Sequence, residues 1–500
     1  MRIIRSGTME SGLSANDRSV ATTSRRGFLG GIGAAAFLGL FGFDARAGER
    51  RLRFGVISDI HVWKGRDGKN LNGADRFKEA LRLLRERDVD AVMIAGDLTE
   101  RGVNEEMQMV ADAWFEIFPD DKGLNGKQVT RLITTGNHDF GGYKLYCRGD
   151  AALKEKLKAD SMEADPAAFW TKYWHEPYAE NFTKTVNGYT FVFSHCHRWK
   201  DIGKYLNGLK LDPSKPFFYC LHLHPEGTVY AHPVSHAPDY ITRVLERHPN
   251  AIVFSGHTHE PLNDPSAVWQ GAFTSIATGA VSQLFIGGEK TRENYMPAKG
   301  PGETRTLEMP RMRLHDGSVA QIVDVFDDRM VVEAVSLAYG CRVREDIVVP
   351  FPSCRDDASR PYSFSPRRET DLPPEFPSDA AVSVRTPKKP GQDRDNRKHS
   401  QTIISFDRAT PRSGGLRDYE ILIERRDGDG WKQILVRRVF ALWFYLPEAK
   451  ALELMSEKKL KDRCVIASAD MPKAETLRIR ITPYDFWGKP GKELVKETTI

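Results

Sequence analysis

Residues 54–61 read FGVISDIH, an apolar run that ends in an acidic side chain and an imidazole. Apolar residues then recur at helical spacing over 74–84, and a second apolar run, AVMIA at 91–95, leads into a Gly-Asp pair. Short apolar runs indicate buried strands, and alternation of strands with helices is typical of parallel pairing. This alternation continues to about residue 263 and predicts an α/β domain with a largely parallel sheet.

Further elements follow the same pattern. Strands are expected at 131–134, 189–194, 217–221 and 251–255, helices at 107–118 and 239–247, and a hairpin at 322–337 that closes the domain. Residues 286–317 are rich in Gly, Pro, Arg and Glu and are expected to form an insertion or long loop.

The composition changes after residue 350. Residues 351–400 are rich in Pro, Ser, Asp and Arg, which is typical of a linker. Beyond them, short alternating strands flank the turn sequence RDGDG at 426–430. We predict a leader at 1–47, an α/β domain at 48–350, a linker at 351–377 and a small β-sandwich at 378–500.

The N-terminal segment has the layout of a cleavable export signal. Residues 24–29 read SRRGFL, the Gly/Ala/Leu/Phe-rich run 28–43 follows, and Ala45-Arg46-Ala47 offers small residues at the positions that a signal peptidase reads. The Arg pair resembles the twin-arginine type, which implies the twin-arginine export machinery as a partner and a periplasmic location. The apolar run is short and diluted by glycine, so cleavage after Ala47 is favoured over a membrane anchor, and no transmembrane span is expected in the mature chain.

Charge and cysteine content exclude several classes of protein. The 500 residues hold 73 Lys+Arg and 68 Asp+Glu, a net charge of +5. The first 47 residues carry six Arg against three acidic residues, or +3, which leaves only +2 for the remainder. A nearly balanced body argues against a nucleic-acid binder. The six Cys include no CxxC pair, so free thiols are favoured over a disulfide scaffold, with Cys341 and Cys354 the one pair worth testing.

Four short polar clusters directly follow predicted strands. They are Asp59-Ile60-His61, Gly96-Asp97, Gly136-Asn137-His138-Asp139 and Gly256-His257-Thr258-His259. The ends of parallel strands are where α/β proteins place their sites. Carboxylates, an amide oxygen and several imidazoles suit Mn, Fe, Zn or Co better than Mg or Ca. Two such ions need a bridging ligand, and together they activate a water and stabilise a phosphate under in-line attack. Gly96 and Gly136 are expected to let the chain turn sharply at the strand ends.

In this order the four clusters resemble the calcineurin-like metallophosphoesterases, over about Arg51 to Leu337. The resemblance implies a four-layer α/β/β/α sandwich with a dinuclear metal site and a metal-bound hydroxide as nucleophile. It implies that Asp59, His61 and His259 hold one ion, that Asn137, His257 and a further His hold the other, and that Asp97 bridges them. It also implies that His138 is the general acid or stabilises the phosphate oxygens, with Asp139 orienting it.

The further His is one of two residues in the stretch CLHLHP at 220–225. His222 directly ends the apolar run and is the predicted ligand, with His224 on the substrate side as the alternative. His195, His197, His232 and His236 are possible pocket-lining residues. Histidines 175, 248, 315 and 399 lie outside any cluster, and a surface or core role is favoured for them.

These features predict a metal-dependent hydrolase of small-molecule phosphoric esters, either monoesters or diesters. Purple acid phosphatases, relatives within the fold, carry a Tyr ligand three positions after the Asp of Gly-Asp, where this chain has Glu100, so a tyrosinate-iron site is not expected. The alternatives are an inactive surface-binding protein and a hydrolase of nucleotide-sugar or lipid pyrophosphates. Measuring the metal content distinguishes an inactive surface-binding protein from an enzyme. Identifying the released product distinguishes a pyrophosphate hydrolase from a phosphoesterase.

Overall fold

The computed structural model describes residues 45–65, 70–231, 236–286, 312–392, 398–457, 460–471 and 475–499. Most of the predicted leader, residues 1–44, lies outside the described residues, as do His232 and most of the predicted long loop at 286–317. Within the described ranges, no helix combines the length and the apolar character needed to cross a membrane.

The stretch that opens the α/β pattern forms the centre of a six-stranded sheet with the order β16-β15-β14-β1-β4-β5. Strand β1 pairs in parallel with β4, and β4 with β5, while β14, β15 and β16 extend the sheet antiparallel on the other side of β1. The bounds are β1 Leu52–Ile57, β4 Ala91–Ala95, β5 Thr130–Thr134, β14 Val319–Val325, β15 Arg329–Ser336 and β16 Ile347–Pro350. The predicted closing hairpin is therefore present, and a third strand continues it.

A second six-stranded sheet has the order β10-β11-β9-β8-β7-β6. Its four inner strands run parallel, and the two edge strands run antiparallel to their neighbours. The bounds are β6 Asn181–Val186, β7 Tyr189–Ser194, β8 Phe217–Cys220, β9 Ala251–Ser255, β10 Val268–Gln270 and β11 Thr274–Ala277.

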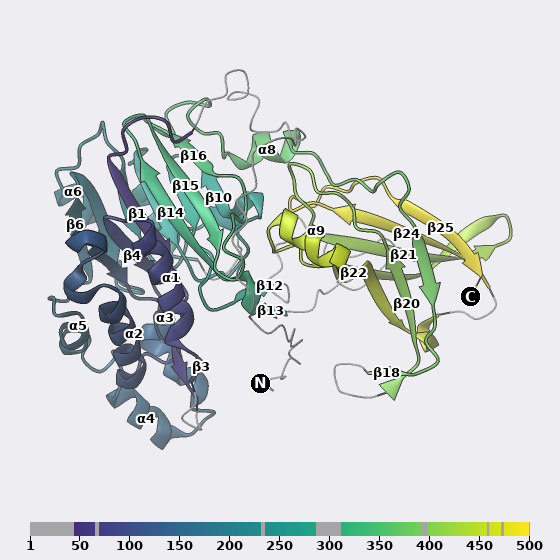
Figure 1. The fold of residues 1–500 in the computed structure, drawn as a ribbon, viewed down its shortest axis with the longest axis horizontal. Coiled ribbons are helices and arrows are strands. Elements are labelled where there is room, and N and C mark those ends of the chain that lie inside the picture. The colour runs from purple at the N-terminus through teal and green to yellow at the C-terminus, as the bar shows by residue number, and fades with distance from the viewer. Residues whose placement is uncertain are drawn as a thin grey trace.

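The two sheets pack face to face. The Phe54 ring on β1 lies 5.2 Å from Phe191 of β7 and 5.0 Å from Phe218 of β8, measured between ring centroids, and all three side chains are fully buried. Helices α1 (Ala74–Glu86), α2 (Asn104–Ile117) and α5 (Pro166–Trp174) share a core with the outer face of the first sheet, and α6 (Ile202–Gly208) and α7 (Asp239–Leu245) with that of the second. This is the predicted four-layer α/β/β/α sandwich (Figure 1). Two short helices, α3 (Asn137–Gly141) and α4 (Ala151–Ala159), follow β5.

The C-terminal region is built from two antiparallel sheets, as predicted, with the orders β17-β20-β23 and β22-β21-β24-β25. Both sheets contribute apolar side chains to one core, for example Ile404 and Ile466 from the first and Ile421 and Ile479 from the second. The bounds are β17 Val382–Arg385, β20 Gln401–Phe406, β21 Asp418–Asp427, β22 Gly430–Phe440, β23 Asp462–Ala467, β24 Thr476–Tyr484 and β25 Leu494–Thr499. A helix that the alternating pattern did not predict, α9 (Glu448–Glu457), packs Ala451 and Leu454 into this core.

Short pairs of strands complete the chain. They are β2 (Trp63–Lys64) with β3 (Asn70–Asn72), β12 (Leu284–Ile286) with β13 (Met312–Leu314), and β18 (Gly391–Gln392) with β19 (Lys398–His399).

The segment predicted to be a linker has a helix and buried contacts of its own. Helix α8 (Phe364–Thr370) lies within it, Tyr362 joins the core between the two large sheets, and buried Asp371 accepts a hydrogen bond from Trp487 Nε1 at 2.7 Å. A few aromatic and acidic side chains thus anchor a segment whose Pro and Ser content indicated an open linker.

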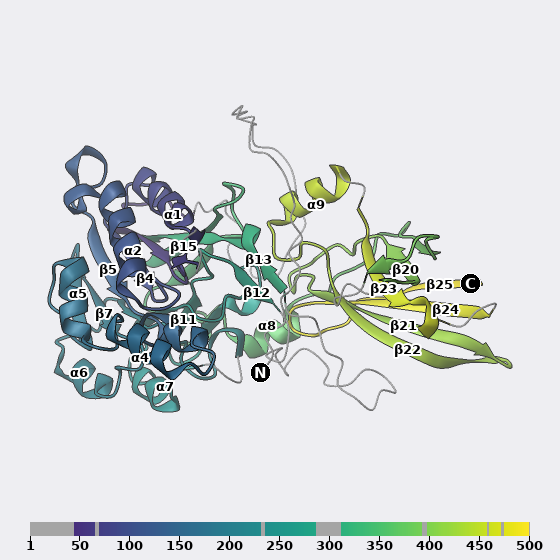
Figure 2. The ribbon, with the colours of Figure 1, turned by 90° about the horizontal axis from the view of Figure 1, so that it is seen from below.

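The two halves of the molecule lie side by side, with β12, β13 and α8 near the boundary between them (Figure 2). Leu284 of β12 is buried in the core of the C-terminal sandwich. The Asn263 side-chain amide donates a hydrogen bond to the Phe444 carbonyl, and the Tyr445 hydroxyl donates one to Asp316 at 3.2 Å. The sandwich therefore packs against β12, the loop after β9 and the turn between β13 and β14.

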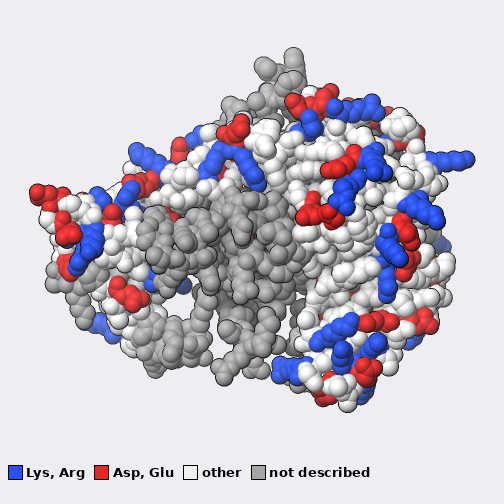
Figure 3. All heavy atoms as spheres, turned by 180° about the vertical axis from the view of Figure 1, so that it is seen from behind, with Lys and Arg blue, Asp and Glu red and all other residues white. Residues whose placement is uncertain are grey.

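All six cysteines are free, so the Cys341–Cys354 pair does not form. Acidic and basic side chains are interspersed over the described part of the face drawn in Figure 3. This distribution agrees with the nearly balanced charge of the sequence after residue 47.

Candidate metal centre

The four polar clusters lie at the ends of strands from both large sheets. Asp59 and His61 follow β1, Asp97 follows β4, and the third cluster starts α3 after β5. His257 and His259 follow β9 of the second sheet, and the His257 backbone N–H donates to the Asp59 carboxylate at 3.0 Å. The face-to-face packing of the sheets thus brings these clusters together.

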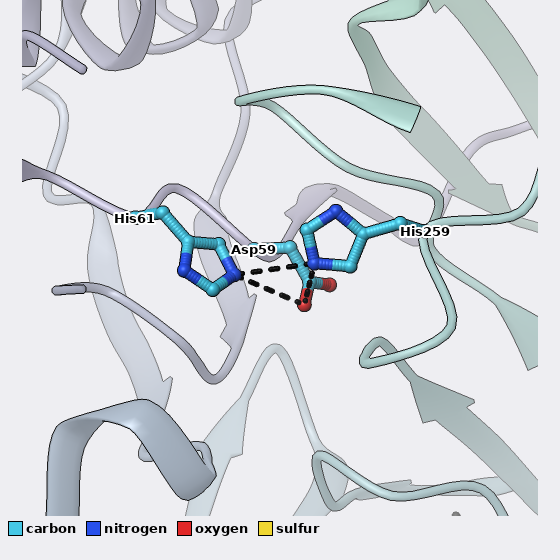
Figure 4. Close-up of side chains that lie close together, drawn as sticks. All are labelled: Asp59, His61 and His259. Carbon is cyan, nitrogen blue, oxygen red and sulfur yellow. Dashed lines mark hydrogen bonds and ion pairs between the residues drawn. The ribbon is translucent and has the colours of Figure 1, made fainter. Parts of the chain in front are cut away.

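Asp59, His61 and His259 form a first group whose donor atoms lie close enough to hold one metal ion. The His259 Nε2 atom lies 3.1 Å from Asp59 Oδ1 and 3.1 Å from His61 Nε2, and His61 Nε2 lies 3.9 Å from Asp59 Oδ1 (Figure 4). The three side chains come from two different sheets and point toward one another.

Asp97, His222 and His257 form a second such group. His222 Nε2 lies 3.1 Å from Asp97 Oδ2, and the His222 and His257 ring centroids are 5.1 Å apart. Of the two predicted alternatives, it is His222 that joins this group; His224 is in none of the groups formed by the described residues. Asp97 Oδ2 also lies 3.5 Å from His61 Nε2, so this carboxylate stands between the two groups.

The rings have the orientation that metal ligation requires. His61 Nδ1 hydrogen-bonds Glu100 Oε2 at 2.7 Å, His259 Nδ1 the Gln283 carbonyl at 2.7 Å, and His222 Nδ1 the Ala95 carbonyl at 2.8 Å. Each outer nitrogen therefore carries a proton, and Nε2 is the atom of each ring that faces the carboxylates and would bind a metal.

Asn137 supplies a further sign that the residues fit a cation. Its Oδ1 atom is buried and accepts no hydrogen bond from any described residue. An unpaired buried carbonyl oxygen costs about 1–3 kcal/mol, so a ligand at this oxygen would remove an unfavourable feature. The donor set therefore fits divalent transition metals, and Asn137 belongs with it.

The backbone of this site is strained. Residues Asp59, His61, Asp97, His257 and His259 have φ angles from 50° to 71°, in the left-handed region. For residues other than glycine this costs about 1–3 kcal/mol each, and such residues concentrate at functional sites. Asp and His tolerate the region better than branched residues do.

Glycines beside the ligands serve two different needs. Gly96 has φ +89°, which agrees with the predicted sharp turn. Gly136 instead has extended φ and ψ of −103° and −173°. A Cβ atom at Gly136 would lie 2.0 Å from Asp97 Oδ1, so glycine is needed there for close approach and not for the turn.

The surroundings of the candidate ligands keep the Asp97 carboxylate charged and the His257 ring neutral. Burial opposes ionisation of Asp97, but His222 and His138 hold the pKa of its carboxyl below its usual range. Burial and the charge of His222 lower the pKa of His257 to about 3, so this ring is neutral at pH 7. Burial favours neutral His222, yet Asp97 raises the pKa of that ring to about 9. A proton therefore competes with a metal for His222.

The partner of His138 differs from the predicted one. Asp139 was expected to orient this ring, but the Asp139 carboxylate accepts hydrogen bonds from the backbone N–H groups of Leu98, Thr99 and Gly136, at 3.2, 2.9 and 2.8 Å. His138 Nδ1 instead donates to the Glu100 carbonyl at 2.8 Å. Asp139 thus ties the β4 and β5 loops together, because its carboxylate accepts from N–H groups at both strand ends.

The other candidate histidines are distributed around the centre. His195 is buried, stacks on Tyr178 with a centroid distance of 4.7 Å and lies 3.0 Å from Thr135 Oγ1, and burial lowers its pKa to about 3. These contacts describe a packed core residue. His197 is exposed, and the His236 Nδ1 atom hydrogen-bonds the Ala237 carbonyl at 2.8 Å.

Sequence reasoning assigned no role to three groups that contact the predicted ligands. The Ser58 hydroxyl donates to Asp59, the Gln283 carbonyl fixes His259, and Glu100 contacts both His61 and His138. In the sequence, Glu100 was notable only as the residue three positions after Asp97. The Gln283 contact is made by the main chain and leaves no trace in side-chain identity.

Comparisons with known proteins agree with this geometry. The profile of calcineurin-like phosphoesterases matches residues 52–261, which include all four clusters. No curated protein matches the chain.

Several solved structures are similar to part of the chain. A purple acid phosphatase from yellow lupin seeds has 13% identity and a TM-score of 0.38, over 59% of this chain and 53% of that one. GAP50, the anchor in the inner membrane complex of Plasmodium, has 16% identity and a TM-score of 0.33, over 59% and 87%. A predicted phosphoesterase from Streptococcus pneumoniae has 15% identity and a TM-score of 0.25, over 61% and 99%.

Proposed function

We propose that this chain, whose residues 52–261 match the calcineurin-like phosphoesterase family, is a metal-dependent phosphoesterase with two ions in the centre described above. The observation that carries the proposal is the position of Asp97 between two groups of potential ligands. Asp59, His61 and His259 would hold one ion, Asn137, His222 and His257 the other, and Asp97 would contact both. Bound divalent ions supply an activated water and charge neutralisation for a phosphate.

The residues of the chain bind, orient and protonate. The Nδ1 contacts of His61, His222 and His259 hold these rings with their Nε2 atoms pointing inward, where they would bind the ions. His138 donates from Nδ1 to the Glu100 carbonyl, which orients the ring so that, in its doubly protonated form, it can give the Nε2 proton to a leaving oxygen. The ring is partly exposed, with 17% of the side-chain surface accessible, so a substrate oxygen is able to reach it.

The test is a metal-reconstitution assay on the chain from residue 48 onward. Chelator-treated protein is loaded with Mn²⁺, Fe²⁺, Zn²⁺ or Co²⁺, its metal content is measured, and it is assayed on phosphomonoesters, phosphodiesters and a nucleotide-sugar pyrophosphate. We expect two ions per chain and hydrolysis of a monoester or diester that disappears with chelation. Hydrolysis of the pyrophosphate alone would identify the alternative substrate class, and a chain without metal or activity would contradict the proposal.

We also propose that the twin-arginine machinery exports the protein to the periplasm, because SRRGFL at 24–29 precedes the apolar run. Changing Arg25 and Arg26 together to Lys is expected to leave uncut precursor in the cytoplasm of the bacterial host, as seen by fractionation and immunoblotting. The matched control changes Arg2 and Arg5 to Lys in the same polar stretch and should be exported normally. Normal processing of the Arg25/Arg26 variant would show that another route is used.

A further inference from the structure

Glu100 lies one imidazole ring away from the candidate metal ligands. Its carboxylate hydrogen-bonds His61 Nδ1 at 2.7 Å through Oε2 and accepts from the Tyr146 hydroxyl through Oε1. His61 turns its other nitrogen, Nε2, toward Asp59 and His259. The Glu100 side chain is therefore on the far side of the ring from the metal groups, and it is largely buried, with 14% of its surface accessible.

We propose, on the basis of the proposed function, that Glu100 is a positioning residue: its carboxylate orients the His61 ring and its backbone carbonyl orients the His138 ring. Its carboxylate holds the proton of His61 on Nδ1 and so keeps the Nε2 lone pair available for a metal. Its backbone carbonyl accepts from His138 Nδ1 at 2.8 Å and so leaves Nε2 of the acid directed to the substrate. One residue thereby links a metal ligand to the proton donor.

The charge of this partner distinguishes His61 from His259 and His222. His259 and His222 hydrogen-bond neutral carbonyls, those of Gln283 and Ala95. A carboxylate partner makes an imidazole a stronger donor to a metal than a carbonyl partner does. Glu100 therefore strengthens binding at the group formed by Asp59, His61 and His259, and leaves the group of His222 and His257 unaffected.

Surrounding contacts hold the Glu100 carboxylate in place. The Glu100 N–H donates to the Val62 carbonyl at 3.0 Å, which fixes its backbone beside β2. Tyr146, whose hydroxyl binds the carboxylate, packs its ring on Trp63 with centroids 5.3 Å apart. The backbone contact with Val62 and the side-chain contact with Tyr146 thus hold Glu100 in place. A residue that orients another side chain needs such a fixed position.

The test measures binding of Mn²⁺ alone to the chelator-treated chain from residue 48 onward, by calorimetry at one pH, for wild type, Glu100→Gln and Glu100→Ala. Loss of a group that orients a metal-binding His typically weakens binding about 10–100-fold. We expect that loss for one of the two ions in Glu100→Ala, a smaller loss in Glu100→Gln, and no change for the second ion. Excess Mn²⁺ should restore most of kcat, because the ligands themselves remain.

Glu106→Gln is the matched control. Glu106 is fully buried and accepts hydrogen bonds from Arg101 N and Nε, at 2.7 and 2.6 Å, in place of contacts with the candidate ligands. It should change the melting temperature without changing Mn²⁺ affinity. Glu100→Gln keeps the shape of the side chain and serves if the alanine variant does not fold.

Two results would overturn the positioning role. Unchanged affinity for both ions in the Glu100 variants would show that the hydrogen bond to His61 has no effect on binding. Complete loss of one ion that excess Mn²⁺ does not restore would make Glu100 a ligand. The proposed function fails separately, if wild-type protein with two bound ions hydrolyses no phosphoester.

Discussion

Asp97→Ala is expected to abolish hydrolysis, with a loss of more than about 10³-fold, and to reduce bound metal more than any other single substitution in the centre. Removing one group that stabilises charge usually costs about 10²–10³-fold, and Asp97 contacts both ligand groups. Its Oδ1 atom also accepts the His138 N–H at 2.8 Å, so the start of α3 loses a fixed point. The measurements are metal content of the purified chain and turnover of the best phosphoester.

Asp97→Asn separates charge from shape. Asn tolerates the left-handed backbone, where φ is 50°, and fills the same space. This variant should fold and still lose one ion. The control is Asp462→Asn in the sandwich, a similarly buried carboxylate that accepts from the Tyr419 hydroxyl at 2.7 Å, and it should keep both ions. Two bound ions with full turnover in either Asp97 variant would refute the assignment of the centre.

His138→Ala is expected to keep both ions and to lose roughly 10²–10⁴-fold in rate, the usual contribution of a general acid. The loss should depend on the leaving group. An activated aryl phosphate leaves without a proton and should retain more of its rate, whereas an alkyl phosphate should lose the most. The measurement is kcat/KM for a series of substrates with different leaving-group pKa values.

Two other outcomes of the His138→Ala experiment would assign His138 a different role. A rate loss independent of the leaving group would assign His138 to electrostatic stabilisation of the phosphate oxygens. Loss of one ion would make His138 a metal ligand. The geometry supports this alternative, because donor atoms of His138, His61 and Asp97 also lie close enough together to hold a metal.

Most of the α/β fold could be predicted from apolar runs. Strands β1, β4 and β9 are buried on both faces, so each is a short, nearly continuous hydrophobic segment that ends at a polar cluster. Helix α9 was missed although its sequence EAKALELMSE consists mainly of good helix formers, because strands dominate the surrounding pattern.

The contacts around the ligands could be predicted less well. Asp139 was assigned to His138 by the family resemblance, but its carboxylate binds backbone N–H groups of two loops. The acceptor that faces His138 is the backbone carbonyl of Glu100, and a main-chain contact leaves no pattern in composition or hydrophobicity. Residue types therefore identify the candidate donors, and their partners follow only from the folded main chain.

Gln283 and Leu284 are joined by one peptide bond, yet they serve different halves of the molecule. The Gln283 carbonyl holds the His259 ring, and the Leu284 side chain is packed in the core of the C-terminal sandwich. A shift of that core moves Leu284, and because the peptide unit is rigid it also moves the carbonyl in front of the imidazole. The C-terminal sandwich thus helps to fix the position of the Gln283 carbonyl. The orientation of the His259 ring therefore depends on core residues more than a hundred positions later in the chain.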